Sequence, residues 1–202
     1  MAPRVNDMNE GLLFVFSAPS GTGKSTILNK VVNEDPNIEY SVSATTRLPR
    51  KGETDGKDYF FLDRETFIDN IKHDMMLEYD IYCNNYYGTL KNAVEEPMKN
   101  GIDIILEITV PGALQVKKIY PDCIMVFIAP PDLKELERRI RRRGTEDDYV
   151  IQKRLQRAAE EMKYINQYDY VVINDDLNKA VNEVKQLIIE NRKKRRNINH
   201  DE

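Results

Sequence analysis

The stretch "FSAPSGTGKSTIL" at residues 16–28 carries the clearest chemistry, because it follows an apolar run and precedes a helix-like segment. Glycines at 21 and 23 allow backbone amides to gather around a phosphate, and the helix that follows presents its positive end. Lys24 can neutralise the β- and γ-phosphates, and the Ser25 hydroxyl can hold a Mg²⁺ ion between them. The spacing matches a P-loop. It predicts an ATP-binding loop made of Ala18, Pro19, Ser20, Gly21, Thr22, Gly23, Lys24, Ser25 and Thr26.

The stricter P-loop pattern has glycine where this chain has Ala18. Alanine fits if that residue keeps ordinary strand-like dihedral angles. A glycine-rich helix entry without a ligand is the alternative reading, and the complete Gly-Lys-Ser ending argues against it. The Asp-x-x-Gly and Asn-Lys-x-Asp elements of signalling GTPases are absent from the sequence, so guanine has no support as the base of the P-loop nucleotide.

Arginines near turns form a second group of candidates: two in "TTRLPRKG", five in "RRIRRRGTEDD" and two in "KRLQRA". Planar guanidinium groups match phosphate oxygens well, and phosphoryl transfer between two phosphorylated substrates needs concentrated positive charge. This pattern favours a kinase that acts on a phosphorylated acceptor. For any single arginine, a solvated helix face remains the alternative. Gly144 makes its segment look like the hinge of a mobile flap.

The elements that must position these residues alternate in type along the chain. Apolar runs predict strands at 12–18, 101–109, 123–129 and 170–174, and amphipathic segments predict helices at 24–34, 133–144 and 177–196. This alternation predicts an α/β fold with a P-loop NTPase-type parallel sheet flanked by helices. Shorter strands at 40–47, 57–62, 77–82 and 85–90 around a helix at 64–74 predict a small mixed lobe inserted into it. Asp132 and Glu135 form an expected capping box.

Length and charge limit the remaining classes of function. A chain of 202 residues, 41% of them hydrophobic, can bury one core and carry a small inserted lobe. Its net charge of -4 argues against a nucleic-acid-binding surface. Cys83 and Cys123 match no metal-ligand spacing and suit a reduced compartment. The sequence has no membrane-spanning run and no apolar segment near its start, so we expect a cytoplasmic protein without a membrane partner.

Several longer stretches resemble one enzyme family. After the P-loop come "SVSATTRLPRKGETDGKDYFFLDRETF" (41–67), "LEYDIYCNNYYGT" (77–89), "RRIRRRGTEDD" (138–148) and "VINDDL" (172–177). In this order and spacing, from about residue 12 to 189, the chain resembles guanylate kinases, which move a phosphoryl group from ATP to GMP.

The resemblance implies one guanylate kinase-like domain over 1–202, acting as a monomer or homodimer on GMP and dGMP. Its implied parts are a core at 10–39 and 90–190, a GMP-binding lobe at 40–89, a lid at 138–160 and a basic tail at 191–202. The tail is a charge run that we expect to be a solvated helix end.

The resemblance also implies the acceptor site. It places GMP-phosphate ligands at Arg47, Arg50, Tyr59 and Tyr87, and guanine contacts at Ser43, Glu78 and Thr89. The chemistry agrees, because a carboxylate such as Glu78 can accept from guanine N1 and N2 while a hydroxyl donates to O6. Adenine would instead present an acceptor at N1. Taken singly, the two tyrosines also suit half-buried strand positions, so their assignment rests on the resemblance.

The same resemblance places lid arginines at Arg139, Arg143 and Arg154, which would spread the charge of the transferring phosphoryl group together with Lys24 and Arg47. It leaves solvent-facing positions to Arg138, Arg141 and Arg142. Asn174 would lie near the adenine of ATP, where a helix cap is the alternative role.

One motif departs from the family pattern. The family shows two acidic residues separated by one position, and this chain keeps Glu107 but has Thr109 and Pro111 in "LEITVPGA". Glu107 is assigned to the GMP side, near the Mg²⁺ water shell, or to pairing a lid arginine. The second carboxylate of the guanine pocket is expected to be missing. Two other functions remain open: a P-loop kinase of this fold with another phosphorylated acceptor, and a non-catalytic guanylate kinase-like binding module.

Overall fold

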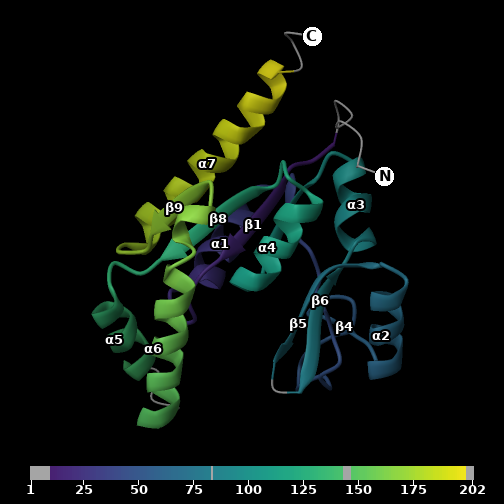
Figure 1. Cartoon of the computed structure of the whole chain (residues 1–202). Helices are drawn as coiled ribbons and strands as arrows, with labels where there is room; N and C mark the ends of the chain where they lie inside the picture. Colours follow the sequence, from purple (N-terminus) through teal and green to yellow (C-terminus); the bar gives the residue numbers. More distant parts are fainter. Residues whose placement is uncertain (1–9, 83, 143–146, 199–202) are drawn as a thin grey trace. The chain divides into compact units, whose positions relative to one another are not determined.

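The computed structural model describes residues 10–82, 84–142 and 147–198. The chain forms two compact units (Figure 1). The first unit comprises Met1–Phe14 and Asn37–Cys123, and the second comprises Val15–Pro36 and Ile124–Glu202. Strand β1 (Leu13–Ser17) begins in the first unit and ends in the second.

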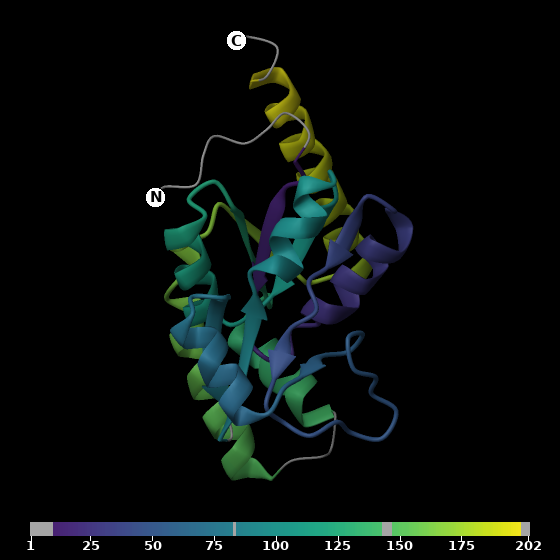
Figure 2. The ribbon, with the colours of Figure 1, turned by 90° about the vertical axis from the view of Figure 1, so that its right-hand side faces the viewer.

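The first unit contains a mixed sheet with the strand order β4-β3-β6-β5. Its elements are β3 (Ala44–Thr45), β4 (Phe60–Phe61), α2 (Arg64–Lys72), β5 (Met76–Tyr82) and β6 (Asn85–Leu90). Strand β6 pairs antiparallel with β5 and with β3, and β3 pairs parallel with β4. Phe67 of α2 is fully buried in a cluster with Ala44 and Met76, so the apolar side of that helix is packed on the sheet. A long segment, 46–59, joins β3 to β4 (Figure 2).

The first unit also carries β2 (Ile38–Tyr40), α3 (Asn92–Lys99), β7 (Asp103–Glu107) and α4 (Val110–Ile119). Strand β2 pairs parallel with β7, whose three middle residues are apolar and buried between Asp103 and Glu107. Helix α4 begins at an N-cap, Thr109, whose hydroxyl accepts from the Gly112 amide at 3.3 Å. Capping by threonine satisfies an amide that the helix itself leaves unpaired. Thr109 thus starts α4 two residues after the end of the parallel strand β7.

The second unit contains α1 (Lys24–Glu34), β8 (Ile124–Ala129), α5 (Leu133–Arg142), α6 (Asp148–Met162), a 3₁₀ turn (Ile165–Gln167), β9 (Tyr170–Ile173) and α7 (Leu177–Ile198). Strand β8 is buried along its whole length and pairs parallel with β9. Helices α5 and α6 share a core cluster that includes Leu136, Ile140 and Ile151 (Figure 1). An ion pair of 2.6 Å between Arg192 and Asp35 joins α7 to the end of α1.

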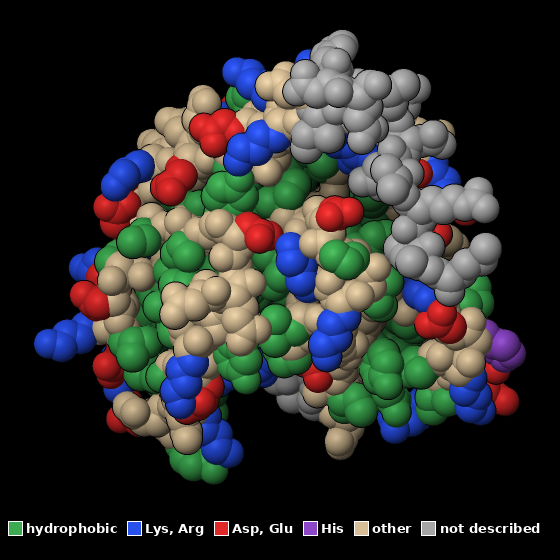
Figure 3. Space-filling model, turned by 45° about the horizontal axis from the view of Figure 1, so that its top comes forward, with side chains coloured by type: hydrophobic (Ala, Val, Ile, Leu, Met, Phe, Trp, Pro, Cys, Tyr) green, Lys and Arg blue, Asp and Glu red, His purple; other side chains and the backbone are tan. Residues whose placement is uncertain are grey.

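The five-stranded sheet of the chain has the strand order β2-β7-β1-β8-β9. The predicted α/β class with a parallel sheet is thus confirmed. The predicted helix at 24–34 matches α1, and the predicted strands at 123–129 and 170–174 match β8 and β9 closely. No helix of the described residues is long and apolar enough to cross a membrane. Basic and acidic side chains are interspersed on the face in Figure 3.

Two expectations about local structure were wrong in part, and three helices were missed. The single strand predicted at 40–47 is divided, because β2 ends at Tyr40 and joins the larger sheet while β3 belongs to the small one. Helices α3, α4 and α6 were not predicted. Asp132 caps α5 through the Glu135 amide at 2.7 Å, but the Glu135 carboxylate binds arginines of α5 instead of returning to the cap.

Candidate active site

The loop between β1 and α1 has the backbone geometry of a phosphate-binding turn. Gly21 and Gly23 have φ angles of 99° and 87°, in the left-handed region that favours glycine. A Cβ atom on Gly23 would lie 2.8 Å from Nδ2 of Asn174, so a side chain has no room there. Described non-glycine residues with positive φ are Asp74 and Asn84, so Ala18 keeps an ordinary conformation as the sequence required. The two glycines thus adopt the left-handed conformations that allow the loop to curl.

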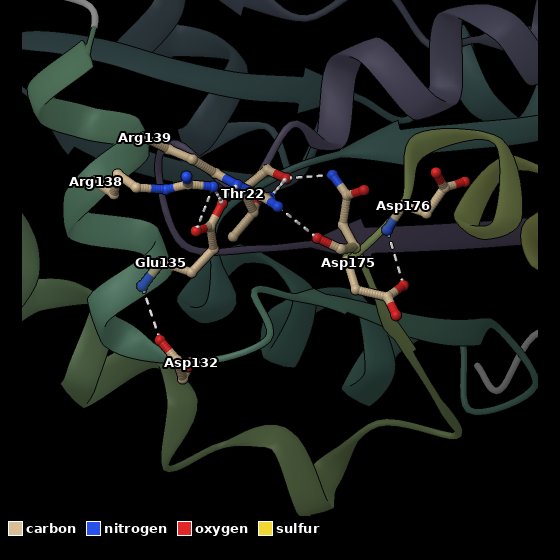
Figure 4. A network of polar contacts seen from close by, with 8 residues as sticks. Thr22, Asp132, Glu135, Arg138, Arg139, Asp175 and Asp176 are labelled. Carbon is tan, nitrogen blue, oxygen red and sulfur yellow. Dashed lines mark hydrogen bonds and ion pairs between the residues drawn. The ribbon is translucent and has the colours of Figure 1, made fainter.

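Contacts from distant parts of the second unit hold this loop (Figure 4). The carbonyl oxygen of Thr22 accepts from Nδ2 of Asn174 at 2.6 Å and from Nη1 of Arg139 at 3.4 Å. Arg139 also donates through Nη2 to the carbonyl of Asn174 at 2.9 Å. Thr22 is itself 1% exposed and donates through its hydroxyl to Pro19. The loop is therefore fixed before any ligand arrives.

The functional side chains of the loop lie at the first turn of α1. Nζ of Lys24 lies 3.4 Å from the carbonyl oxygen of Phe16, which brings the ammonium back toward the end of β1. Ser25 and Thr26 are exposed on the same turn, and Ser20 is exposed before it. Nη2 of Arg154 on α6 donates to the Ser20 hydroxyl at 2.6 Å. One predicted lid arginine thus contacts the predicted ATP loop directly.

The arginines of α5 surround a carboxylate that the sequence did not single out. Glu135 accepts from Nε of Arg139 at 2.7 Å and pairs with Nη2 of Arg138 at 2.8 Å. These hydrogen bonds lower the pKa of Glu135 to about 2. Its charge is therefore held through the physiological pH range, and it orients the Arg139 guanidinium along α5.

A cavity of about 460 Å³ opens beside these groups. It is lined by loop residues, by α5 and by the segment after β9: Gly21, Thr22, Gly23, Thr26, Glu135, Arg138, Arg139, Arg142, Asn174, Asp175 and Leu177. Arg138 is 77% exposed, as expected, yet it borders the cavity together with Arg142, which the sequence analysis did not foresee. Arg141 binds Glu137 and Asp148 instead. Arg143 lies outside the described residues.

In the first unit, the small sheet carries the predicted guanine contacts. Glu78 is 5% exposed, and its Oε1 atom accepts from the Thr89 hydroxyl at 2.8 Å, directly across from it on β6. Ser43 immediately precedes Ala44, which pairs with Gly88. Burial raises the pKa of Glu78 to about 7, and the nearby Asp80 charge adds to the rise while the Thr89 hydrogen bond opposes it.

Three of the predicted phosphate ligands lie together in the same unit. The Arg47 guanidinium lies 5.4 Å from the centre of the Tyr59 ring, and the Tyr59 and Tyr87 ring centres are 6.2 Å apart. Arg47 donates to both carboxylate oxygens of Glu53 at 2.9 Å each. The hydrogen bonds that Arg47 makes with Glu53 and Tyr87 raise the pKa of its guanidinium. Arg50 is exposed, and its backbone amide donates to the same Glu53 at 2.7 Å.

Glu107 is the last residue of β7, and Thr109 follows it as the N-cap of α4. Glu107 is half-buried. Burial raises the pKa values of Tyr40 and Tyr59, and the charge of Glu107 adds to both rises. Thr109 lies 3.5 Å from Oδ2 of Asp80 through its hydroxyl. The family-type carboxylate is absent at position 109, but the structure brings a carboxylate from β5 to that place. Sequence reasoning missed both Asp80 and Glu53. The only sequence signals were an acid two residues after Glu78 and an acid within a basic loop.

Comparisons with known proteins agree on one family. The family model described as guanylate kinase matches residues 11–191. A guanylate kinase of Desulfitobacterium hafniense is 49% identical over 183 residues, which cover 91% of this chain and 92% of that protein. One of Streptococcus thermophilus is 51% identical over 88% of this chain and 86% of its own. The crystal structure of guanylate kinase from Anaplasma phagocytophilum superposes with a TM-score of 0.72 at 32% identity, covering 91% of this chain and 87% of that one.

Proposed function

The chain belongs to the guanylate kinase family, and from this premise we infer that it transfers the γ-phosphoryl group of ATP to GMP, forming ADP and GDP. The observation that carries this inference is the buried Glu78 carboxylate, which the Thr89 hydroxyl contacts on the same sheet as the cluster of Arg47, Tyr59 and Tyr87. A hydrogen-bond acceptor suited to a nucleobase and a cluster suited to a phosphate group therefore occur in the same small sheet.

On the donor side, the loop amides and Lys24 would bind the phosphates of ATP, and the cavity beside Thr22 and Asn174 has room for a nucleoside. The Asn174 amide can contact the adenine edge. No group of three or more His, Cys, Asp or Glu side chains in the described parts of the chain could hold a metal by itself. We assign Mg²⁺ to the exposed Ser25 hydroxyl and phosphate oxygens of ATP, where the ion would neutralise phosphate charge.

On the acceptor side, Glu78 would accept from guanine N1 and N2, while Ser43 supplies a hydroxyl to the base and Thr89, whose proton goes to Glu78, holds that carboxylate in place. Arg47, Arg50, Tyr59 and Tyr87 would hold the monophosphate, and we assign Glu107 to the same GMP side. Adenine presents an acceptor at N1 and would face the Glu78 carboxylate with the wrong polarity. The site therefore selects guanine, as GMP and dGMP.

Transfer requires the two ligands to meet while positive groups surround the moving phosphoryl. Lys24, Arg47, Arg139, Arg143 and Arg154 are the residues we assign to this task. We also propose the parts of the chain as a core at 10–39 and 90–190, an inserted lobe at 40–89 and an arginine-rich lid at 138–160. We further propose that the enzyme is cytoplasmic and acts as a monomer or homodimer.

A coupled assay of ADP release tests the proposal, with ATP and each of GMP, dGMP, AMP, CMP and UMP as acceptor. We expect turnover with GMP and dGMP, and a large drop in Lys24→Ala because its charge follows the phosphoryl group into the transition state. Lys30→Ala, on the exposed side of the same helix, is the control and should keep wild-type turnover. Preference for another monophosphate would favour the second kinase reading, and binding of GMP without ADP release would favour a binding module.

A further inference from the structure

We propose that Asp80 is a specificity-determining residue that accepts a hydrogen bond from the exocyclic 2-amino group of guanine, so that this chain distinguishes GMP from IMP through Asp80. The proposal rests on the proposed function and names the part of the base that Asp80 reads. It replaces the expectation that the guanine site has lost its second carboxylate.

Strand register places Asp80 on the face of the sheet that carries the guanine contacts. Glu78 is paired with Thr89, and Asp80 is paired with Tyr87, on the antiparallel strands β5 and β6. Side chains two residues apart on a strand share one face, and directly paired residues share it too. Four polar groups therefore line one surface, whereas Tyr79 and Ile81 point the other way and are 39% and 55% exposed.

The start of α4 lies against the same surface. A Cβ atom on Gly112 would be 2.6 Å from Oε2 of Glu78 and 3.5 Å from the Thr109 hydroxyl oxygen, so this glycine permits the close approach. The Thr109 hydroxyl accepts from the Gly112 amide, which leaves its proton to donate to Oδ2 of Asp80 at 3.5 Å. The other oxygen of Asp80 accepts from the Ile81 amide at 2.7 Å. These contacts direct Oδ2 toward Thr109 and the helix start, the side on which Glu78 also lies.

Two carboxylates in this position repel each other. Asp80 is half-buried, and Glu78 is almost fully buried. Like charges held close together away from water raise the free energy of the empty site. A ligand with several adjacent N–H donors relieves that repulsion, because each carboxylate gains at least one donor.

Guanine is such a ligand. Its edge offers one N1–H and two N2–H donors, and Glu78 can accept N1–H and one N2–H. The remaining N2–H then needs an acceptor of its own, and a buried donor without one weakens binding. Asp80, two residues after Glu78 and on the same face of β5, supplies it. Hypoxanthine keeps N1–H but has no 2-amino group, so IMP cannot use Asp80.

The experiment compares Asp80→Asn with the wild-type chain, using ATP with GMP and with IMP. We expect kcat/KM for GMP to fall about 10- to 100-fold, the range for losing a charge-assisted hydrogen bond, while kcat/KM for IMP changes less than twofold. Asp69→Asn removes an exposed carboxylate of α2 and should leave both values unchanged. A GMP value within threefold of wild type, or equal losses for GMP and IMP, would overturn the proposal.

Thermal unfolding and a second variant separate recognition from folding. Asp80→Asn should not lower Tm, because it removes a repulsion and keeps a polar group of the same size. In Asp80→Ala, the further change Thr109→Asp should restore at least part of the GMP preference over IMP, since aspartate is a good N-cap and lies beside the vacated place. No restoration would contradict the proposal. Wild-type protein that does not prefer GMP to AMP would overturn the proposed function and this inference together.

Discussion

The side-chain amide of Asn174 donates a hydrogen bond of 2.6 Å to the backbone carbonyl oxygen of Thr22. The two residues are 152 positions apart, and both are nearly fully buried. Buried backbone groups without a partner are costly, so this bond fixes the end of β9 against the phosphate loop. Asn174 also lines the cavity, and the Oδ1 atom of its side-chain amide is a hydrogen-bond acceptor.

Replacing this amide by a carboxylate should damage the donor site alone. In Asn174→Asp an acceptor faces the Thr22 carbonyl, which we expect to cost about 1–3 kcal/mol. Tm should fall by roughly 2–4 °C for each kcal/mol in a chain of this size. The KM for ATP should rise while the KM for GMP stays constant. Asn178→Asp, on the first turn of α7, is the matched control, and equal behaviour of the two variants would contradict the assignment.

Arg139 should matter for both stability and rate. It donates to Glu135, to Thr22 and to Asn174, so Arg139→Ala removes three contacts as well as a positive charge. We expect kcat to fall by orders of magnitude, the KM for GMP to change little, and Tm to decrease. Arg141→Ala, which breaks exposed ion pairs on the same helix, should change none of these. A rise in the KM for GMP as large as the loss in kcat would show a role in binding the acceptor instead.

Glu53 should position Arg47. Its carboxylate binds the guanidinium through both oxygens and also caps the Arg50 amide, which lowers the pKa of Glu53. In Glu53→Gln one charge-assisted contact becomes neutral, so we expect the KM for GMP to rise about 3- to 30-fold with kcat nearly constant. Steady-state kinetics measure the split between the two constants. Glu65→Gln, at an exposed position of α2, is the control. A loss confined to kcat in Glu53→Gln would contradict a positioning role.

Local sequence patterns predicted the parts of the structure whose conformation depends on residues close together in the sequence. The phosphate loop follows from Gly21, Gly23 and Lys24, because dihedral freedom and charge are properties of the residues themselves. Strand β8 follows from an unbroken apolar run, and α1 from its amphipathic pattern.

Long-range pairings could not be predicted in this way. Asp80 meets Thr109 because β5 packs on α4, and a separation of 29 positions along the chain gives no local signal. Glu135 was expected to complete a cap, but two arginines on its own helix compete for the carboxylate more strongly than a backbone amide does. The division of 40–47 into β2 and β3 depends on two different partner strands.

Glu78 gives a prediction about pH. Burial raises its pKa to about 7, so between about pH 4.5 and 7 the folded chain binds a proton that the unfolded chain has lost. The free energy of unfolding therefore decreases as pH rises through this window, and Glu78→Gln should remove that part of the decrease. Urea unfolding at pH 5 and pH 8 measures the difference. A Glu78→Gln variant with the wild-type pH dependence would contradict the raised pKa.

The same group should control acceptor choice. Only the ionised carboxylate can accept from both N1 and N2 of guanine, so the KM for GMP should rise as pH falls below about 7. AMP has the same titrating phosphate but does not need the Glu78 carboxylate, and its profile separates the two effects. Glu78→Gln should flatten the difference between them and reduce the ratio of kcat/KM for GMP over AMP by about 30- to 1000-fold, corresponding to about 2–4 kcal/mol. If that ratio hardly changes, guanine is not recognised through Glu78.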